Sequence, residues 1–153
     1  MSVNTWTVKD ILKIGAEMEL DSYNFYTQTA EKSEYPGGVR LLKKLASDEK
    51  RHRAYFLKAL DNPESIEPRI LTENVTDLKL TDKLVNVPLD PKADFPQILK
   101  FAAQREKVAY DFYIQISEML DETDFGQMVH NFAMEELHHK KLLEEEYDEI
   151  TGW

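Results

Sequence analysis

The chain has 153 residues, of which 42% are hydrophobic and 31% charged, a composition typical of one folded domain. Its formal net charge of -10 argues against nucleic acid as a partner, because phosphates require a basic surface. The absence of cysteine excludes disulfides, thiolate nucleophiles and cysteine-ligated clusters. No apolar run approaches the roughly 20 residues that span a bilayer, and the start of the chain lacks the features of a signal peptide. We therefore expect a cytoplasmic protein with no membrane partner.

The first periodic segment predicts a helix over residues 7–33. Thr7 is a suitable capping residue, and Asp10 lies in the first turn, where a negative charge is favourable. Apolar residues then recur at intervals of three and four, the pattern of a helix that buries one face. Glu19 interrupts this apolar face. The Pro-Gly-Gly sequence at 36–38 predicts the break that follows.

A second helix is predicted over residues 39–60, antiparallel to the first because the connection is short. Glu49 and His52 both occupy its apolar face. Side chains three residues apart project from a helix about one turn apart, which is a spacing that metal ligands use. A single Glu-x-x-His pair is common on surface helices, so this pair alone is weak evidence.

Residues 62–93 contain four prolines and little periodicity. Two consecutive bundle helices that run in the same direction need a connection as long as the bundle. We therefore predict that this segment is a crossover, with a helical turn at about 75–84.

The third helix is predicted over residues 94–120. Asp94 and Gln97 match a capping box, and Glu106 interrupts the apolar face that follows. A short turn leads to a fourth helix over residues 123–150, with Glu136 and His139 on its apolar face.

The two halves of the chain repeat each other. Glu106, Glu136 and His139 each lie 87 residues after Glu19, Glu49 and His52, which indicates an internal duplication of a helical hairpin. The repeat also indicates which of two overlapping Glu-x-x-His pairs in the fourth helix is the candidate ligand pair. Glu135 and His138 have the same spacing as Glu136 and His139 but do not match the first half, so we place them on the solvated flank.

The pattern favours a metal site. Burying a carboxylate without compensation costs several kcal/mol, so four glutamates on apolar faces need an explanation. Two divalent cations would neutralise four carboxylates while both imidazoles remain uncharged. Carboxylate and imidazole ligands without cysteine suit iron first and manganese second. The predicted cofactor is therefore two iron ions.

These residues resemble the rubrerythrin-type diiron domain of the ferritin-like superfamily, over about residues 7–60 and 94–150. The resemblance implies an all-α, ferritin-like four-helix bundle of two duplicated hairpins joined by a long crossover, within a single domain spanning 1–153. It also implies that Glu49 and Glu136 bridge two metals. Glu19 and His52 would be terminal ligands of one metal, and Glu106 and His139 of the other.

Two features depart from that family. Rubrerythrins add a cysteine-ligated rubredoxin domain, and this sequence has no cysteine, so electrons would come from a separate donor. Rubrerythrins also carry a further carboxylate one turn before the third-helix glutamate, where this chain has Ala103. The ligand set is therefore similar to the simpler six-residue set of bacterioferritins.

The function that we expect is a non-haem dinuclear iron oxidoreductase that reacts Fe(II) with peroxide or dioxygen, in oxidative-stress or iron metabolism. Tyr26 and Tyr113 are candidate hydrogen-bond donors to the ligating carboxylates, with an aromatic core role as the alternative. His130 is expected at the surface. The resemblance also implies a homodimer. The alternative functions are a non-catalytic iron-handling bundle and a manganese catalase-like dimanganese enzyme.

Overall fold

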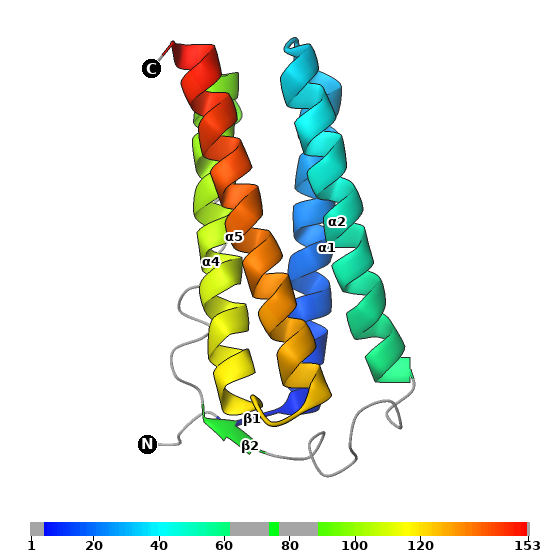
Figure 1. The fold of residues 1–153 in the computed structure, drawn as a ribbon. Helices are drawn as coiled ribbons and strands as arrows, with labels where there is room; N and C mark the ends of the chain where they lie inside the picture. Colours follow the sequence, from blue (N-terminus) through cyan, green and yellow to red (C-terminus); the bar gives the residue numbers. More distant parts are fainter. Residues whose placement is uncertain (1–4, 62–73, 77–88, 153) are drawn as a thin grey trace. The chain divides into compact units, whose positions relative to one another are not determined.

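The computed structural model describes residues 5–61, 74–76 and 89–152. In this part of the chain four long helices carry almost all of the regular structure, which confirms the predicted all-α class (Figure 1). The elements in chain order are β1 (Thr5–Thr7), α1 (Val8–Lys32), α2 (Pro36–Asp61), β2 (Asn74–Thr76), α4 (Phe95–Met119) and α5 (Asp124–Thr151).

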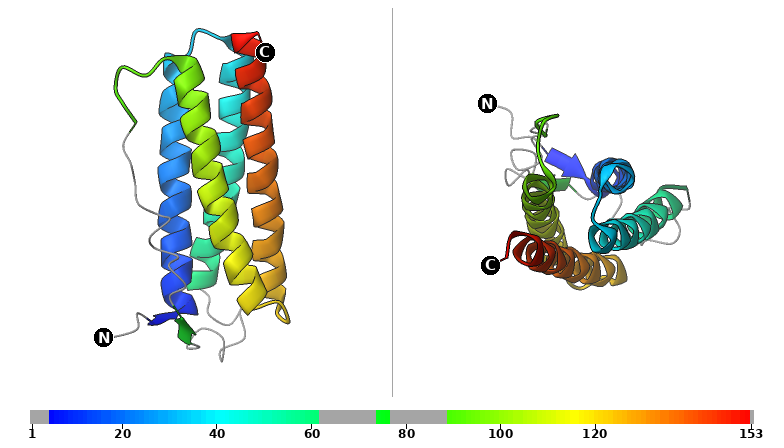
Figure 2. Two further views of the ribbon diagram at one scale, coloured as in Figure 1. Left: turned by 90° about the vertical axis from the view of Figure 1, so that its left-hand side faces the viewer. Right: turned by 90° about the horizontal axis from the view of Figure 1, so that it is seen from above.

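The helices fall into two compact units. The first unit contains α1 and the part of α2 from Leu42 onward, together with the strand pair. The second contains α4 and α5, together with residues 33–41. In each unit two helices run antiparallel and side by side (Figures 1 and 2). The two predicted hairpins are therefore present.

Helix lengths preserve the sequence repeat. When α1 (Val8–Lys32) is moved along the chain by 87 residues, its bounds coincide with those of α4 (Phe95–Met119). Leu12 in α1 and its counterpart Leu99 in α4 are both fully buried. The duplicated apolar periodicity thus gives the same helix with the same buried face twice.

Helices α1 and α4 both begin at a side-chain cap. The Asp10 backbone N–H donates to Thr7 Oγ1 over 3.2 Å, and the Thr7 backbone N–H donates to Asp10 Oδ2 over 3.0 Å. This backbone bond, together with the Thr7 hydroxyl, lowers the pKa of the Asp10 carboxyl below its ordinary value. The same reciprocal arrangement joins Asp94 and Gln97 at the start of α4, as the sequence predicts.

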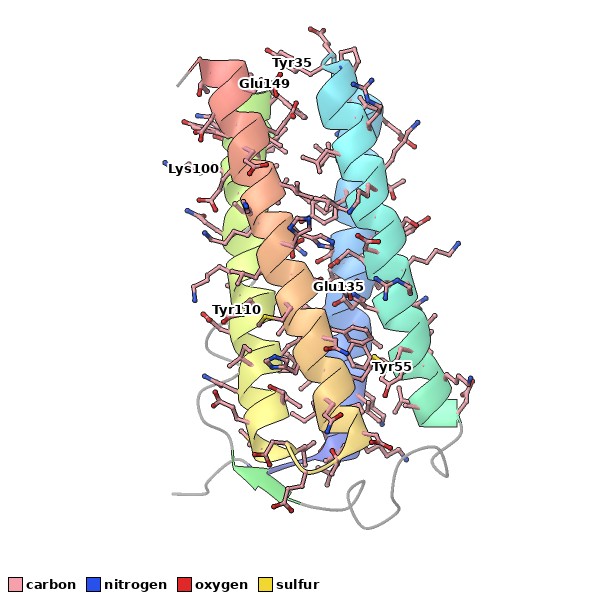
Figure 3. The ribbon with its side chains drawn as sticks, viewed as in Figure 1. Tyr35, Tyr55, Lys100, Tyr110, Glu135 and Glu149 are labelled. Carbon is pink, nitrogen blue, oxygen red and sulfur yellow. The ribbon has the colours of Figure 1, made fainter. Side chains whose placement is uncertain are left out.

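The start of α2 differs from the prediction. The helix begins at Pro36 rather than at residue 39, because proline is well tolerated at the first helical position, where its missing N–H is not needed. The ring of Phe95 packs against the first turn and stacks on Tyr35 with ring centroids 5.2 Å apart. A Cβ at Gly38 would lie 2.5 Å from this ring, so glycine is required there by packing. Tyr35 is labelled in Figure 3.

A short strand pair was not predicted from the sequence. β1 pairs antiparallel with β2, with Thr5 opposite Thr76 and Thr7 opposite Asn74. The expected helical turn is wrong at Val75 and Thr76, which are β-branched residues that favour an extended backbone. The rest of that predicted turn, and most of the crossover, lie outside the described residues.

None of the helices in the described part of the chain offers an apolar stretch that would let it cross a membrane.

The turn between α4 and α5 leaves no space for a side chain at Gly126. Thr123 Oγ1 caps α5 by accepting a 2.9 Å hydrogen bond from the Gly126 backbone N–H. A Cβ at Gly126 would overlap the backbone carbonyl of Leu120, which cannot rotate away. We expect Gly126→Ala to lower the free energy of unfolding by about 2 kcal/mol, measured by urea denaturation.

Gly37→Ala is the matched control. Its nearest neighbours would be the flexible ends of the Glu146 and Arg40 side chains, at 3.3 and 3.8 Å. This variant should unfold within about 0.5 kcal/mol of the unmodified chain. Equal losses in the two variants would contradict the proposed backbone overlap.

Candidate metal centre

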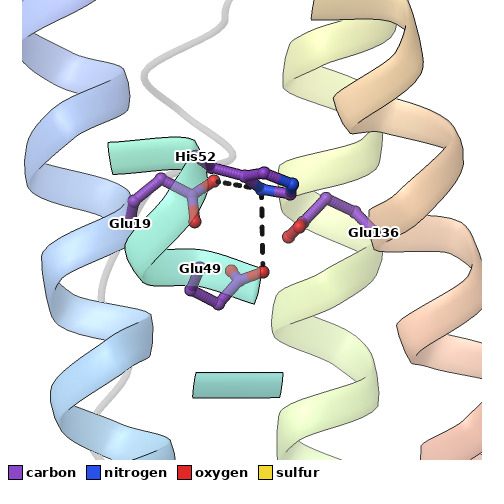
Figure 4. Close-up of side chains that lie close together, drawn as sticks. All are labelled: Glu19, Glu49, His52 and Glu136. Atoms are coloured by element: carbon purple, nitrogen blue, oxygen red, sulfur yellow. Dashed lines mark ion pairs between the residues drawn. The ribbon is translucent and has the colours of Figure 1, made fainter. Parts of the chain in front are cut away.

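Three buried ligand-type side chains meet in the first unit. Glu19 comes from α1, and Glu49 and His52 come from α2, with exposed fractions of 1%, 1% and 0%. One ligand atom from each lies within 4.8 Å of the others. His52 Nδ1 lies 3.5 Å from Glu19 Oε1 and 3.8 Å from Glu49 Oε1 (Figure 4). We call these three residues the first trio.

The second unit contains the same arrangement. Glu106 comes from α4, and Glu136 and His139 come from α5, with exposed fractions of 2%, 1% and 1%. Their ligand atoms also lie within 4.8 Å of one another. His139 Nδ1 lies 3.6 Å from Glu106 Oε2 and 3.6 Å from Glu136 Oε1. These residues form the second trio, and they match the first residue by residue.

The distances within each trio suit the ligands of a metal ion. An N–H···O hydrogen bond is usually about 2.7 to 3.2 Å long, whereas all four imidazole-to-carboxylate distances are 3.5 to 3.8 Å. Two ligand atoms that each lie about 2.1 Å from one ion are separated by roughly 3 to 4 Å. In both trios the nitrogen that faces the carboxylates is Nδ1. The residues present therefore fit a bound metal.

Helix periodicity places each histidine beside its glutamate. The two residues are three apart on one helix, so their side chains project from neighbouring turns of the same face. In α2 this face continues with Leu45 and Phe56, which are 0% and 2% exposed. The ligand pair therefore occupies positions that an apolar helix face would otherwise fill.

The negative charge of the buried carboxylates also favours a bound cation. Each trio brings two carboxylates into a position that is almost fully shielded from water. Such groups are normally compensated by an opposite charge or by coordination to a metal. A divalent cation would neutralise the two carboxylates of a trio while the imidazole stays uncharged.

The two candidate tyrosines are buried, with Tyr26 2% and Tyr113 1% exposed. Tyr26 packs edge-to-face on Phe25 with ring centroids 5.6 Å apart. Tyr113 makes similar contacts with Phe112 and Phe132, at 5.6 and 6.4 Å. These contacts show an aromatic core role, and donation to the ligating carboxylates stays a prediction.

The other residues singled out in the sequence lie away from the trios' buried positions. His138 is exposed and Glu135 is half-buried. His130 is exposed and lines a hollow of about 390 Å³ near the turn between α4 and α5. Sequence reasoning missed a second hollow, between α4 and α5, in which Ala103 forms part of the wall.

Comparison with known proteins gives one family match. A family model described as Rubrerythrin matches residues 10–147, a range that contains both trios. No curated protein and no solved structure matches the chain.

The two overlapping histidines of α5 provide a matched test of the second trio. We expect His139→Ala to lower the iron bound per chain by about one ion, because it removes a ligand from a three-residue site. His138→Ala should leave the iron content unchanged, since that side chain is exposed. Iron is measured by elemental analysis after loading and desalting. Equal iron content in the two variants would contradict the assignment of His139.

Proposed function

Because the chain belongs to the rubrerythrin family, we propose that it is a non-haem dinuclear iron oxidoreductase that reacts Fe(II) with peroxide or dioxygen. Family membership gives the ferritin-like four-helix bundle and the general type of site, a pair of non-haem metals. The observation that supports the proposal is the pair of matching buried trios, each with two carboxylates and one imidazole.

In the proposed site, Glu19, Glu49 and His52 hold one iron ion, and Glu106, Glu136 and His139 hold the other. The pairing of the two ions, with Glu49 and Glu136 as bridging ligands, rests on the family resemblance. When bound, two Fe(II) ions would supply the two electrons that, together with two protons, reduce one molecule of hydrogen peroxide to two molecules of water. Oxygen and nitrogen ligands without cysteine suit iron, with manganese second.

The surrounding protein restricts this chemistry to small reactants. The six ligand side chains are at most 2% exposed, so a bulky substrate cannot reach them without a change in structure. Buried carboxylates also interact strongly with a bound cation, because little water screens their charge. Electrons for repeated turnover would come from a separate donor, and a cytoplasmic homodimer remains part of the proposal.

The test is a single-turnover reaction. The full chain is loaded with Fe(II) without oxygen and mixed with hydrogen peroxide, and iron oxidation is followed by absorbance. We expect one peroxide to be consumed for every two Fe(II), faster than by the same Fe(II) in buffer. The His138→Ala variant should match the unmodified chain, and the His139→Ala variant should be slower.

Three other outcomes would overturn the proposal. Bound iron that oxidises no faster than free Fe(II) would instead favour an iron-handling bundle. Release of dioxygen from peroxide by a manganese-loaded sample, with no reaction of the iron form, would favour a manganese catalase-like enzyme. A chain that binds neither iron nor manganese would exclude the proposed enzyme and both alternative functions.

A further inference from the structure

One side of α2 carries a cluster of positive charge, although the whole chain has a net charge of -10. Within the first unit this helix exposes five cations: Lys43, Lys44, Lys50, Arg51 and Lys58. Counted from Lys43, spacings of seven, eight and fifteen residues return to the same side of a helix that has 3.6 residues per turn. Tyr55, labelled in Figure 3, lies on the same helix. We call these five cations the basic face of α2.

Little of this positive charge is neutralised by neighbouring residues. Asp48 lies 3.4 Å from Lys44 and 3.9 Å from Arg51, so two cations share one carboxylate. The side chains of these two cations stay 56% and 54% exposed. The other three cations form no ion pair with any residue that the structure describes. With Asp61 at the end of the helix, two carboxylates stand against five cations, and the face keeps a net positive charge.

The repeat provides an internal comparison for the basic face. The positions 87 residues further along the chain lie on α5 and are also exposed: His130, Asn131, Leu137, His138 and Glu145. The metal ligands recur unchanged between the repeats, whereas no cation of the basic face recurs as lysine or arginine. Neither helix formation nor the ligand set therefore requires the cations of α2, and they call for a separate role.

Small and apolar side chains lie among the cations. Ser47 and Ala54 are exposed, and Leu57 is 36% exposed. They follow Lys43 by four, eleven and fourteen residues, spacings that keep them on the same side of the helix. A less polar centre with a polar rim is the usual composition of a protein interface, and rim charges steer a partner of opposite charge and fix its orientation. The partner that fits this face is an acidic protein.

The basic face and the proposed ligands occupy opposite sides of α2. Lys50 and Arg51 stand between Glu49 and His52 in the chain, but the two cations are exposed and the two ligands are 1% and 0% exposed. A helix with its side chains is about 10 to 12 Å thick. A protein bound to the basic face would therefore be separated from the first trio by roughly one helix. Electrons can tunnel through such a layer, whereas a substrate cannot pass it.

We propose that the basic face of α2 docks an acidic electron-carrier protein, which delivers electrons through α2 to the metal site. This inference rests on the proposed function, in which electrons for repeated turnover come from a separate donor. Two reduced carriers, docking in turn, each give up one electron; together they return two Fe(III) to two Fe(II) and leave oxidised. A compact protein fits better than a nucleic acid, because an extended polyanion would also meet the acidic remainder of the chain.

The first test measures docking without electron transfer. The probe is an oxidised plant-type ferredoxin, a small acidic iron–sulfur protein that carries one electron. It is titrated into the full chain in a calorimeter. We expect binding whose affinity falls at least about tenfold as salt is raised from about 20 to 200 mM. This measurement needs neither bound iron nor peroxide, so the docking face and the proposed peroxide reaction can fail independently.

Two variants with the same change in charge test the location of the docking face. The α2 variant replaces three cations of the basic face: Lys43→Gln, Lys44→Gln and Lys50→Gln. The control variant replaces three exposed lysines of the second unit: Lys100→Gln, Lys107→Gln and Lys141→Gln. Both should fold, because glutamine is a good helix former at exposed positions. The α2 variant should bind ferredoxin about tenfold more weakly, and the control should stay within about twofold of the unmodified chain.

The same two variants test electron entry. The chain is loaded with iron, oxidised to Fe(III) and mixed without oxygen with reduced ferredoxin below saturation. The rate of iron reduction, followed by absorbance, should fall at least about fivefold in the α2 variant alone.

Four results would overturn the proposal. Two of them are equal effects of the two variants, on binding or on rate, and binding that does not respond to salt. The third is tighter binding of a short DNA duplex than of ferredoxin, which would assign the face to a nucleic acid. The fourth is a dimer that only the α2 variant dissociates, which would assign the face to a second copy of the chain.

Discussion

Four buried carboxylates are the constraint on which this structure depends. Glu19, Glu49, Glu106 and Glu136 are at most 2% exposed, in positions where an apolar side chain would stabilise the fold at no electrostatic cost. A buried charge has a large desolvation penalty unless it is paired or coordinated. The carboxylates in each trio are arranged around an imidazole nitrogen at distances that suit a shared cation. A cation bound by each trio would explain why these residues stand in the core.

Two antiparallel helices position the three ligand side chains of each trio. Each trio takes one glutamate from one helix and a Glu-x-x-His pair from its antiparallel neighbour, so a single hairpin suffices to bring three ligands together. Caps at Thr7 and Asp94 fix where α1 and α4 begin, and this sets the position of Glu19 and Glu106 along their helices. Because the hairpin is duplicated, the same arrangement of three ligand side chains occurs in both units.

Much of this was predictable because the signals are local or repeated. The apolar periodicity around Glu19 gave its helix and its buried face, and the repeat distinguished His139 from His138. The start of α2 was missed because Pro36 and Gly38 resemble a break, and only the packing of Phe95 shows that they belong to the helix. Pairing of β1 with β2 joins residues distant in the chain. The hollow between α4 and α5 is lined by side chains of both helices, and their mutual packing is not determined by the periodicity of either helix alone.

The most direct test of the central claim is an anomalous difference map, recorded at the iron absorption edge, from crystals of the iron-loaded chain. If each trio binds a metal, one peak will lie at bonding distance from His52 Nδ1 and a second at bonding distance from His139 Nδ1, each with glutamate oxygens around it. Iron peaks only at surface carboxylates, with both trios closed by direct hydrogen bonds between their side chains, would contradict the account.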